Sequence, residues 1–191
     1  MARLAADDWI TAAVRVLLTD GPDAVAVQPL ARRLGTTKGS FYWHFASRDD
    51  LLRAALRRWL QLGTEDVIDT IEGATEDPVE RARLLIRMVT EHSLDNPGQL
   101  RLLATADHPD VRAALETAAR RRIGYVARLL RAAGLPAAVA RRRAVLAYSA
   151  YLGHAQLADT TPGVLPTGPA ARRALLTALT ELLFASVDTE T

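Results

Sequence analysis

The sequence predicts an all-α protein with about nine helices. Apolar residues recur at intervals of three or four along most of the chain, which is the spacing of one face of a helix. No segment alternates apolar and polar residues for long enough to predict a β-strand. Glycine and proline separate the periodic segments, most densely at residues 20–23 and 159–169. The 191 residues, of which 49% are hydrophobic, suffice for one or two domains with a sizeable core.

The first part of the chain predicts three helices, over residues 7–19, 27–34 and 38–45. Asp7 and Asp8 favour the start of the first helix, where the helix dipole is positive. Gly35 ends the second helix, in which Pro29 is tolerated because it falls in the first turn. Thr37 is a suitable N-cap for the third helix. Two short helices around a turn with a glycine predict a helix-turn-helix.

The remainder of the chain predicts one long helix and then five more. Ser47 is an N-cap, and Asp50 completes an approximate capping box for the long helix, which runs to about residue 70. The five further helices are expected over residues 78–94, 99–106, 111–133, 137–158 and 170–187. We therefore expect a helix-turn-helix domain over residues 1–50 and a larger helical domain over residues 51–191.

The charges are distributed unevenly along the chain. The formal net charge is only +2, which by itself does not indicate a nucleic-acid partner. Residues 24–47, however, contain no acidic residue, and they include Arg32, Arg33 and the only lysine of the chain, Lys38. This basic window coincides with the predicted helix-turn-helix, which favours contact with a phosphate backbone.

Several classes of protein are excluded or disfavoured by the composition. The absence of cysteine excludes disulfides, thiol nucleophiles and thiolate metal sites. No apolar run approaches the ~20 residues of a membrane span, and acidic residues stand where a signal peptide would be apolar, so a cytoplasmic protein is expected. No His-Glu-x-x-His metal motif, phosphate-binding glycine loop or Gly-x-Ser-x-Gly motif occurs. We therefore expect neither an enzyme nor a bound metal or cofactor.

The third predicted helix has the properties of a recognition helix. Thr37 and Lys38 lie at its N-terminal end, which reaches base edges and phosphates in a major groove. Gly39 and Ser40 are small enough to allow a close approach of the DNA backbone. The residues expected to contact DNA are Gln28, Arg32, Thr37, Lys38, Gly39, Ser40, Tyr42 and His44.

The aromatic residues in this segment have a second interpretation. Phe41 and Phe45 are four residues apart, so they are expected to share the face that packs on the core. Trp43 fits a core position and an exposed one equally well. Arg32 and Arg33 are also compatible with an ordinary solvated helix face.

The sequence LARRLG, followed by TTKGSFYWHF and then RDDLL, resembles the tetracycline-repressor (TetR) family of bacterial transcriptional regulators. The resemblance covers residues 9–56, about the first third of the chain. It implies a homodimeric repressor that binds a palindromic operator in double-stranded DNA and is released by a small-molecule effector. It also implies that Gln28 reads a base and that Tyr42 and His44 bind phosphates.

The sequence departs from the family pattern at three positions. Ala5 and Ala26 stand where the family commonly has a serine or threonine cap, and each lost cap should cost ~0.5–2 kcal/mol of stability. Pro29 replaces a residue that is more usually acidic or polar, which changes the expected direction of Gln28.

The larger domain is expected to hold the dimer interface and an effector pocket. The last two long helices offer the dimer surface, with the candidates Tyr148, Tyr151, Leu152, Leu175, Leu179, Leu182 and Leu183. The candidates for the effector pocket are Trp59, Met88, His92, Leu103, Tyr125, Tyr148 and Tyr151. The monomer core is the simpler explanation for each pocket candidate, and some of the dimer candidates also belong to that core. Nothing in the sequence identifies the effector.

Three alternatives remain open from the sequence alone. The first is an enzyme, which the missing motifs disfavour. The second is a structural interaction module with a degenerate helix-turn-helix, in which Lys38 would not matter for DNA binding. The third is an additional nucleic-acid patch on the arginine runs at residues 120–122 and 141–143, which are otherwise solvated helix faces.

Overall fold

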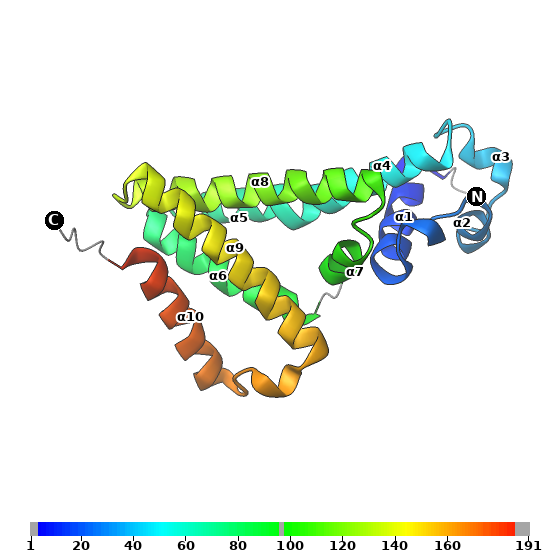
Figure 1. Ribbon diagram of the computed structural model, residues 1–191. Helices are drawn as coiled ribbons and strands as arrows, with labels where there is room; N and C mark the ends of the chain where they lie inside the picture. The colour runs from blue at the N-terminus through cyan, green and yellow to red at the C-terminus, as the bar shows by residue number, and fades with distance from the viewer. Residues whose placement is uncertain (1–3, 96–97, 186–191) are drawn as a thin grey trace. The chain divides into compact units, whose positions relative to one another are not determined.

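The computed structural model describes residues 4–95 and 98–185, apart from the side chains of residues 90–95 and 172. All regular structure in these residues is helical (Figure 1). The α-helices are α1 (Ala6–Asp20), α2 (Val27–Arg33), α3 (Lys38–Phe41), α4 (Arg48–Leu60), α5 (Asp66–Ala74), α6 (Pro78–Asp95), α7 (Gly98–Ala104), α8 (Pro109–Ala132), α9 (Ala137–Thr160) and α10 (Pro169–Phe184). None of the described helices is long and apolar enough to cross a membrane.

A π-helical turn, Gln61–Glu65, joins α4 to α5 without a break in the helical backbone. This continuous run corresponds to the single long helix that the sequence predicts after Ser47. Counted in this way, the described residues form nine helices, and the all-α prediction is confirmed. Short 3₁₀ turns at Pro22–Ala24 and Pro162–Val164 occupy two of the predicted proline-containing loops.

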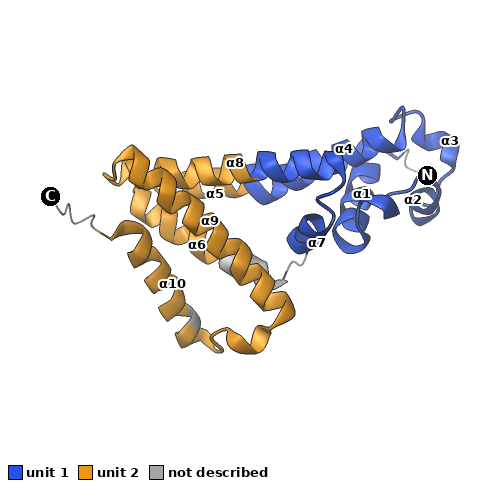
Figure 2. Ribbon diagram, viewed as in Figure 1, with its two compact units in different colours: residues 1–65, 97–118 blue, residues 66–96, 119–191 orange. Residues whose placement is uncertain are grey.

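The chain forms two compact units (Figure 2). Unit 1 comprises Met1–Glu65 and Pro97–Ala118, and unit 2 comprises Asp66–Asn96 and Ala119–Thr191. The predicted domain boundary at residue 50 lies inside unit 1, because most of α4 packs with the N-terminal helices. The packing units therefore do not divide at residue 50. A functional boundary at that residue stays a prediction.

The core of unit 1 forms around side chains from α1, α3 and α4. Trp9, Phe41, Leu51 and Leu52 have no exposed surface. The ring of Phe41 meets that of Trp9 edge to face, with 5.3 Å between the centroids. Burial of such side chains supplies the main stabilisation of the unit, at about 1.5–3 kcal/mol for each fully buried large apolar side chain.

The ends of the N-terminal helices show which caps are present. The Ser47 hydroxyl accepts a hydrogen bond from the Asp50 amide at 3.1 Å, as the capping prediction requires. Neither Ala5 nor Ala26 supplies a side-chain cap, which confirms both expected losses. At α1 the Asp8 carboxylate accepts a hydrogen bond from the Ala5 amide at 2.7 Å, so half of a capping box remains.

The core of unit 2 contains one buried phenol. Tyr125 packs among Ile68, Ile71, Ala82 and Leu129 and is almost completely buried. Burial raises the pKa of the Tyr125 phenol, and the nearby Glu72 carboxylate acts in the same direction. The hydroxyl has no hydrogen-bond partner among the described residues, so the phenol stays neutral and acts as packing.

Candidate nucleic-acid interface

A glycine turn fixes the direction of the chain between α2 and α3. Gly35 has φ +63°, a conformation that side chains with a Cβ rarely adopt. The Thr36 amide donates to the Ala31 carbonyl at 2.9 Å, and the Gly35 amide donates to the Arg32 carbonyl at 3.2 Å. These two bonds complete a Schellman motif, which ends α2 cleanly. The predicted turn is therefore a defined structure and not a loose connection.

The recognition segment begins at Thr37, whose hydroxyl accepts a hydrogen bond from the Ser40 amide at 3.4 Å. The regular part of α3 ends at Phe41, whereas the sequence predicted a helix to residue 45. The Phe41 carbonyl accepts hydrogen bonds from the amides of His44, at 2.9 Å, and Phe45, at 3.0 Å. Sharing one carbonyl in this way tightens the last turn, so residues 42–44 form a turn that continues the helical direction.

The inner side of this segment is held by aromatic packing. Phe41 is fully buried against Trp9, and its ring stacks on that of Phe45 at 5.5 Å. Phe45 is half-buried. Both residues are therefore packing residues, as their four-residue spacing predicted.

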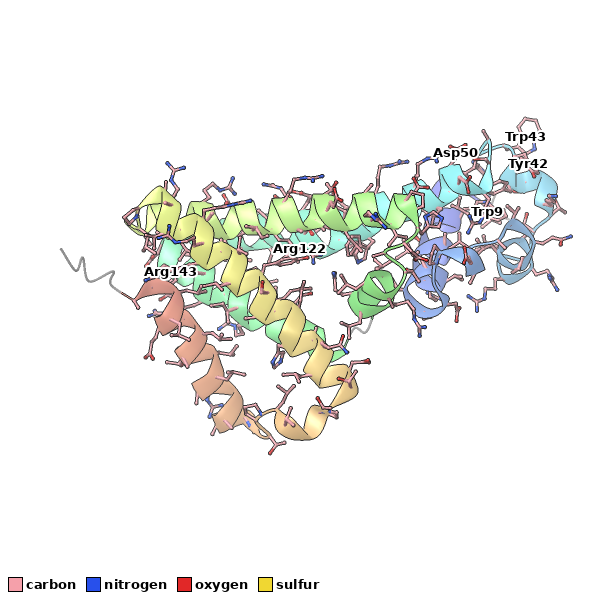
Figure 3. All side chains as sticks on the ribbon, in the orientation of Figure 1. Trp9, Tyr42, Trp43, Asp50, Arg122 and Arg143 are labelled. Carbon is pink, nitrogen blue, oxygen red and sulfur yellow. The ribbon has the colours of Figure 1, made fainter. Side chains whose placement is uncertain are left out.

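The outer side carries two exposed aromatic rings. Tyr42 is 55% exposed and Trp43 is 80% exposed, and Figure 3 shows both rings beyond the end of α3. The Lys38 ammonium lies 5.9 Å from the centroid of the Tyr42 ring, within the range of a cation–π contact. Trp43, which the sequence left undecided, is therefore not a core residue.

The predicted DNA-contacting residues lie on two neighbouring elements of unit 1. Gln28, Arg32, Thr37, Lys38, Gly39 and Tyr42 are exposed, and Ser40 and His44 are half-buried. Among the described residues, no carboxylate lies within ion-pair distance of Arg32 or Lys38. Their positive charges therefore remain available to an external anion.

Arg48 borders the same basic window but has a different role. Its Nε donates to the Val25 carbonyl at 2.9 Å, and its Nη2 donates to the Pro22 carbonyl. It also pairs with Asp49 at 3.1 Å. Arg48 therefore attaches the loop before α2 to the start of α4, and its charge is largely neutralised inside the unit.

Comparison with known proteins assigns this segment to a family. Residues 10–55 match the model of the bacterial regulatory proteins of the tetR family. Residues 10–55 therefore form a TetR-type helix-turn-helix segment. A segment of 52 residues is 38% identical to an uncharacterised HTH-type transcriptional regulator, YwcC, from Bacillus subtilis. This match covers 27% of the present chain and 23% of that protein.

Solved structures of low sequence identity share the whole fold. A TetR-family transcriptional regulator from Agrobacterium tumefaciens has a TM-score of 0.72 at 19% identity, over 93% of this chain and 96% of that one. AibR, solved with isovaleryl coenzyme A and operator DNA, has a TM-score of 0.63 at 16% identity, over 95% and 99% of the two chains. The TetR-family fold thus extends beyond the matched N-terminal segment.

The two arginine runs of the chain do not form uniform basic faces. Arg143 turns inward, where its Nη1 donates to the Leu183 carbonyl at 2.8 Å and the Ala185 carbonyl at 2.6 Å. Arg122 is half-buried and hydrogen-bonds the Tyr148 phenol, whose pKa is raised by burial while Arg122 opposes that shift. One arginine of each run therefore serves the interior of unit 2.

The candidate effector residues are divided between the two units. Trp59 and Leu103 belong to unit 1, whereas Met88, Tyr125, Tyr148 and Tyr151 belong to unit 2. The side chain of His92 lies outside the described residues. Tyr148 and Tyr151 stack with 6.0 Å between their ring centroids.

Unit 2 also contains an apolar groove between α6, α9 and α10, with a volume of about 320 Å³. We call it the α9–α10 groove. Its lining residues are Ile86, Val89, Arg143, Leu146, Ala147, Ala150, Tyr151, His154, Leu175, Leu179, Leu182 and Leu183. Of the candidate effector residues whose side chains are described, only Tyr151 lines it, because apolar periodicity alone does not distinguish a groove wall from a core.

The candidate dimer residues differ in their exposure within one protomer. Tyr148, Tyr151, Leu152, Leu175, Leu179 and Leu183 are half-buried, whereas Leu182 is 70% exposed. Leu146, another apolar residue that the sequence offers on this helix, is 67% exposed on α9. Apolar side chains occur all round α9, so its sequence does not identify the face that is left open.

Proposed function

We propose that the chain is a DNA-binding transcriptional regulator whose α2–α3 face binds an operator. The observation that carries this proposal is the sidedness of the recognition segment. Phe41 fixes one side to the core, while Lys38, Tyr42 and Trp43 are exposed on the other. An exposed cation and two exposed rings on α3 and the turn after it, within a stretch of sequence that has no acidic residue, suit a major groove and its phosphates.

The residues of this face divide into positioning and reading roles. Lys38 and Arg32 supply charge for phosphates, and the Tyr42 hydroxyl and His44 ring supply hydrogen-bond donors. Thr37, Gly39 and Ser40 allow a close approach at the N-terminal end of α3, and Gln28 offers an amide to a base edge. Trp43 adds an apolar contact to this set, which is suited to a thymine methyl or a deoxyribose.

A second copy of the chain is part of the proposal, because one short recognition helix reads few base pairs. Two copies about a two-fold axis would present two helices to a palindromic operator. The open face of α9 beside the groove supports this assembly. Val145 is 41% exposed there, and Ser149 and Gly153, each one turn further along the helix, are small exposed residues that permit close helix packing.

The proposed regulator is a repressor that a small-molecule effector releases from DNA. The fold shared with AibR, which was solved with both isovaleryl coenzyme A and operator DNA, supports a protein with two kinds of ligand. An effector that binds the DNA-incompetent arrangement more tightly than the DNA-competent one shifts the protein toward the DNA-incompetent arrangement. The ratio of these two effector affinities limits how far the DNA affinity falls. Such a protein works on chromosomal DNA, so the cytoplasm remains its expected location.

The decisive experiment is selection of bound fragments from sheared genomic DNA with the full-length protein. We expect enrichment of a palindrome whose half-sites lie about one helical turn apart. The same selection with Lys38→Ala is expected to lose the enrichment. Equal recovery of all fragments by both proteins would contradict the proposed function.

A further inference from the structure

We propose that the α9–α10 groove binds an elongated apolar molecule that ends in a carboxylate. This inference rests on the proposed function, because such a ligand would be the effector of the regulator. It names a chemical class for the ligand and a specific place in unit 2.

The size and lining of the groove suit a small apolar ligand. Its volume, about 320 Å³, lies at the lower end of the range of ligand pockets. The walls come from three helices: Ile86 and Val89 on α6, Ala147 and Tyr151 on α9, and several leucines on α10. Burial of a hydrocarbon chain against these walls is favourable in proportion to the apolar area removed from water.

The shape of the groove indicates an extended ligand. Arg143 and His154 both line it and lie eleven positions apart on α9, which corresponds to roughly 16 Å along the helix axis. The residues between them on this side are mostly apolar or small, among them Leu146, Ala147 and Ala150. A compact polar molecule would leave most of this surface uncovered, whereas an extended chain covers it.

Arg143 determines the chemistry of one end. Figure 3 shows it where the start of α9 approaches the end of α10. Its Nη1 donates to the carbonyls of Leu183 and Ala185, which holds the guanidinium in place. Among the described residues its Nε and Nη2 make no hydrogen bond, and no carboxylate lies within ion-pair distance. A fixed guanidinium with unused donors matches a carboxylate in geometry as well as in charge.

The charge balance of the lining favours an anion over a cation. Among the described side chains, the groove lining contains one arginine, one histidine and no acidic residue. A cationic amphiphile would be placed beside Arg143 without a counter-charge, while a neutral one would leave the unused donors of Arg143 without an acceptor. The carboxylate is therefore the end group that fits.

The test is calorimetric titration of the full-length protein with three probes that share one chain: decanoate, decan-1-ol and decylamine. We expect saturable binding of one decanoate per chain, at least tenfold weaker binding of decan-1-ol and the weakest binding of decylamine. Arg143→Gln should abolish the preference for decanoate. Arg142→Gln, at an exposed arginine that does not line the groove, is the matched control and should retain it.

Two further variants keep the outcome clear. Arg143→Gln also removes the contacts to the end of α10, so Arg143→Lys, which keeps the charge, is expected to retain the order of the probes. Leu179→Trp fills the groove and should block decanoate while the sedimentation coefficient stays unchanged. A changed sedimentation coefficient for Leu179→Trp would mean that a second copy occupies the groove, and this would overturn the proposal.

Equal affinities for decanoate and decan-1-ol, or no binding of either, would also overturn it. DNA binding is measured separately on the same preparations by fluorescence anisotropy. If the wild-type protein binds DNA but shows no preference for decanoate, only the groove ligand is rejected. Failure of the wild-type protein to select any DNA rejects the proposed function.

Discussion

The ring of Phe41 meets that of Trp9 edge to face, with 5.3 Å between the centroids and 69° between the planes. This contact attaches the recognition segment to the first helix of the fold. The indole Nε1 of Trp9 has no hydrogen-bond acceptor among the described residues, so Trp9 acts here through packing. The position of the DNA-facing residues therefore depends on an apolar contact beneath them.

Phe41→Ala should destabilise unit 1 strongly. Phe41 is fully buried, and truncation of a buried phenylalanine leaves a cavity that typically costs about 3–5 kcal/mol. Urea unfolding followed by circular dichroism measures the change. Trp43→Ala is the matched control, because that ring is 80% exposed and its loss should change stability by no more than about 0.5 kcal/mol. Equal destabilisation by both variants would contradict the division into an inner and an outer side.

Lys38→Ala should weaken DNA binding without altering stability or assembly. Lys38 is exposed, and removal of one phosphate contact should lower the steepness of the salt dependence by about one unit. Anisotropy titrations of the selected operator at several salt concentrations measure this. Arg142→Ala removes an exposed positive charge from unit 2 and should leave the salt dependence unchanged. If the logarithm of DNA affinity fell equally steeply with the logarithm of salt concentration for Lys38→Ala and the wild type, Lys38 would not be a phosphate contact.

Arg48→Met should cost stability rather than specific DNA contacts. The guanidinium donates to the carbonyls of Val25 and Pro22, and loss of bonds to a charged donor typically costs about 1–3 kcal/mol. Urea unfolding is expected to show this loss, while the operator affinity of the folded fraction stays within about threefold of the wild type. A large affinity loss with unchanged stability would instead make Arg48 a DNA contact.

The sequence was sufficient for the part of the fold in which local signals agree. Gly35, Thr37 and Ser47 each mark a turn or cap that the structure contains, and the periodic segments correspond to the helices. The early end of α3 at Phe41 could not be predicted, because the shared carbonyl depends on how Phe41 is buried against Trp9. Exposure of Trp43 likewise depends on tertiary packing.

The larger unit was less predictable, because apolar residues surround its helices. The sequence could not tell that Leu146 is exposed while Leu179 is half-buried, since both fit an apolar helix face. It also could not predict that Arg143 turns inward from an arginine run to bind two carbonyls on α10. The exposure and direction of such side chains depend on contacts with residues that are some forty positions away in the chain.

Asp50→Asn should destabilise the start of α4 in a pH-dependent way. The hydrogen bond from Arg53 and, next, that with Ser47 hold the pKa of the Asp50 carboxyl below its ordinary value of 3.8. A carboxyl with a lowered folded-state pKa stabilises the fold above its unfolded-state pKa, and this stabilisation is lost as the pH falls through the folded-state pKa.

The difference in unfolding free energy between wild type and Asp50→Asn should therefore be present at pH 7 and shrink below about pH 4. Urea unfolding at a series of pH values measures it. Asp69→Asn, at an exposed carboxylate of α5 with no ion pair among the described residues, is the control. A pH-independent difference for Asp50→Asn would show that the carboxylate charge is not what matters.

The double variant Val145→Glu, Leu157→Glu should prevent assembly of two copies. These side chains are 41% and 40% exposed on α9 and do not line the α9–α10 groove, so two acidic groups there would be buried without partners in a dimer. Sedimentation velocity should show a monomer, and operator affinity should fall at least tenfold because two recognition helices no longer bind together. Val164→Glu is the control, because Val164 is 67% exposed but lies in the turn between α9 and α10. A double variant that still sediments as a dimer would show that the dimer interface lies elsewhere. A wild-type protein that binds the palindrome tightly as a monomer would show that operator binding does not require a dimer.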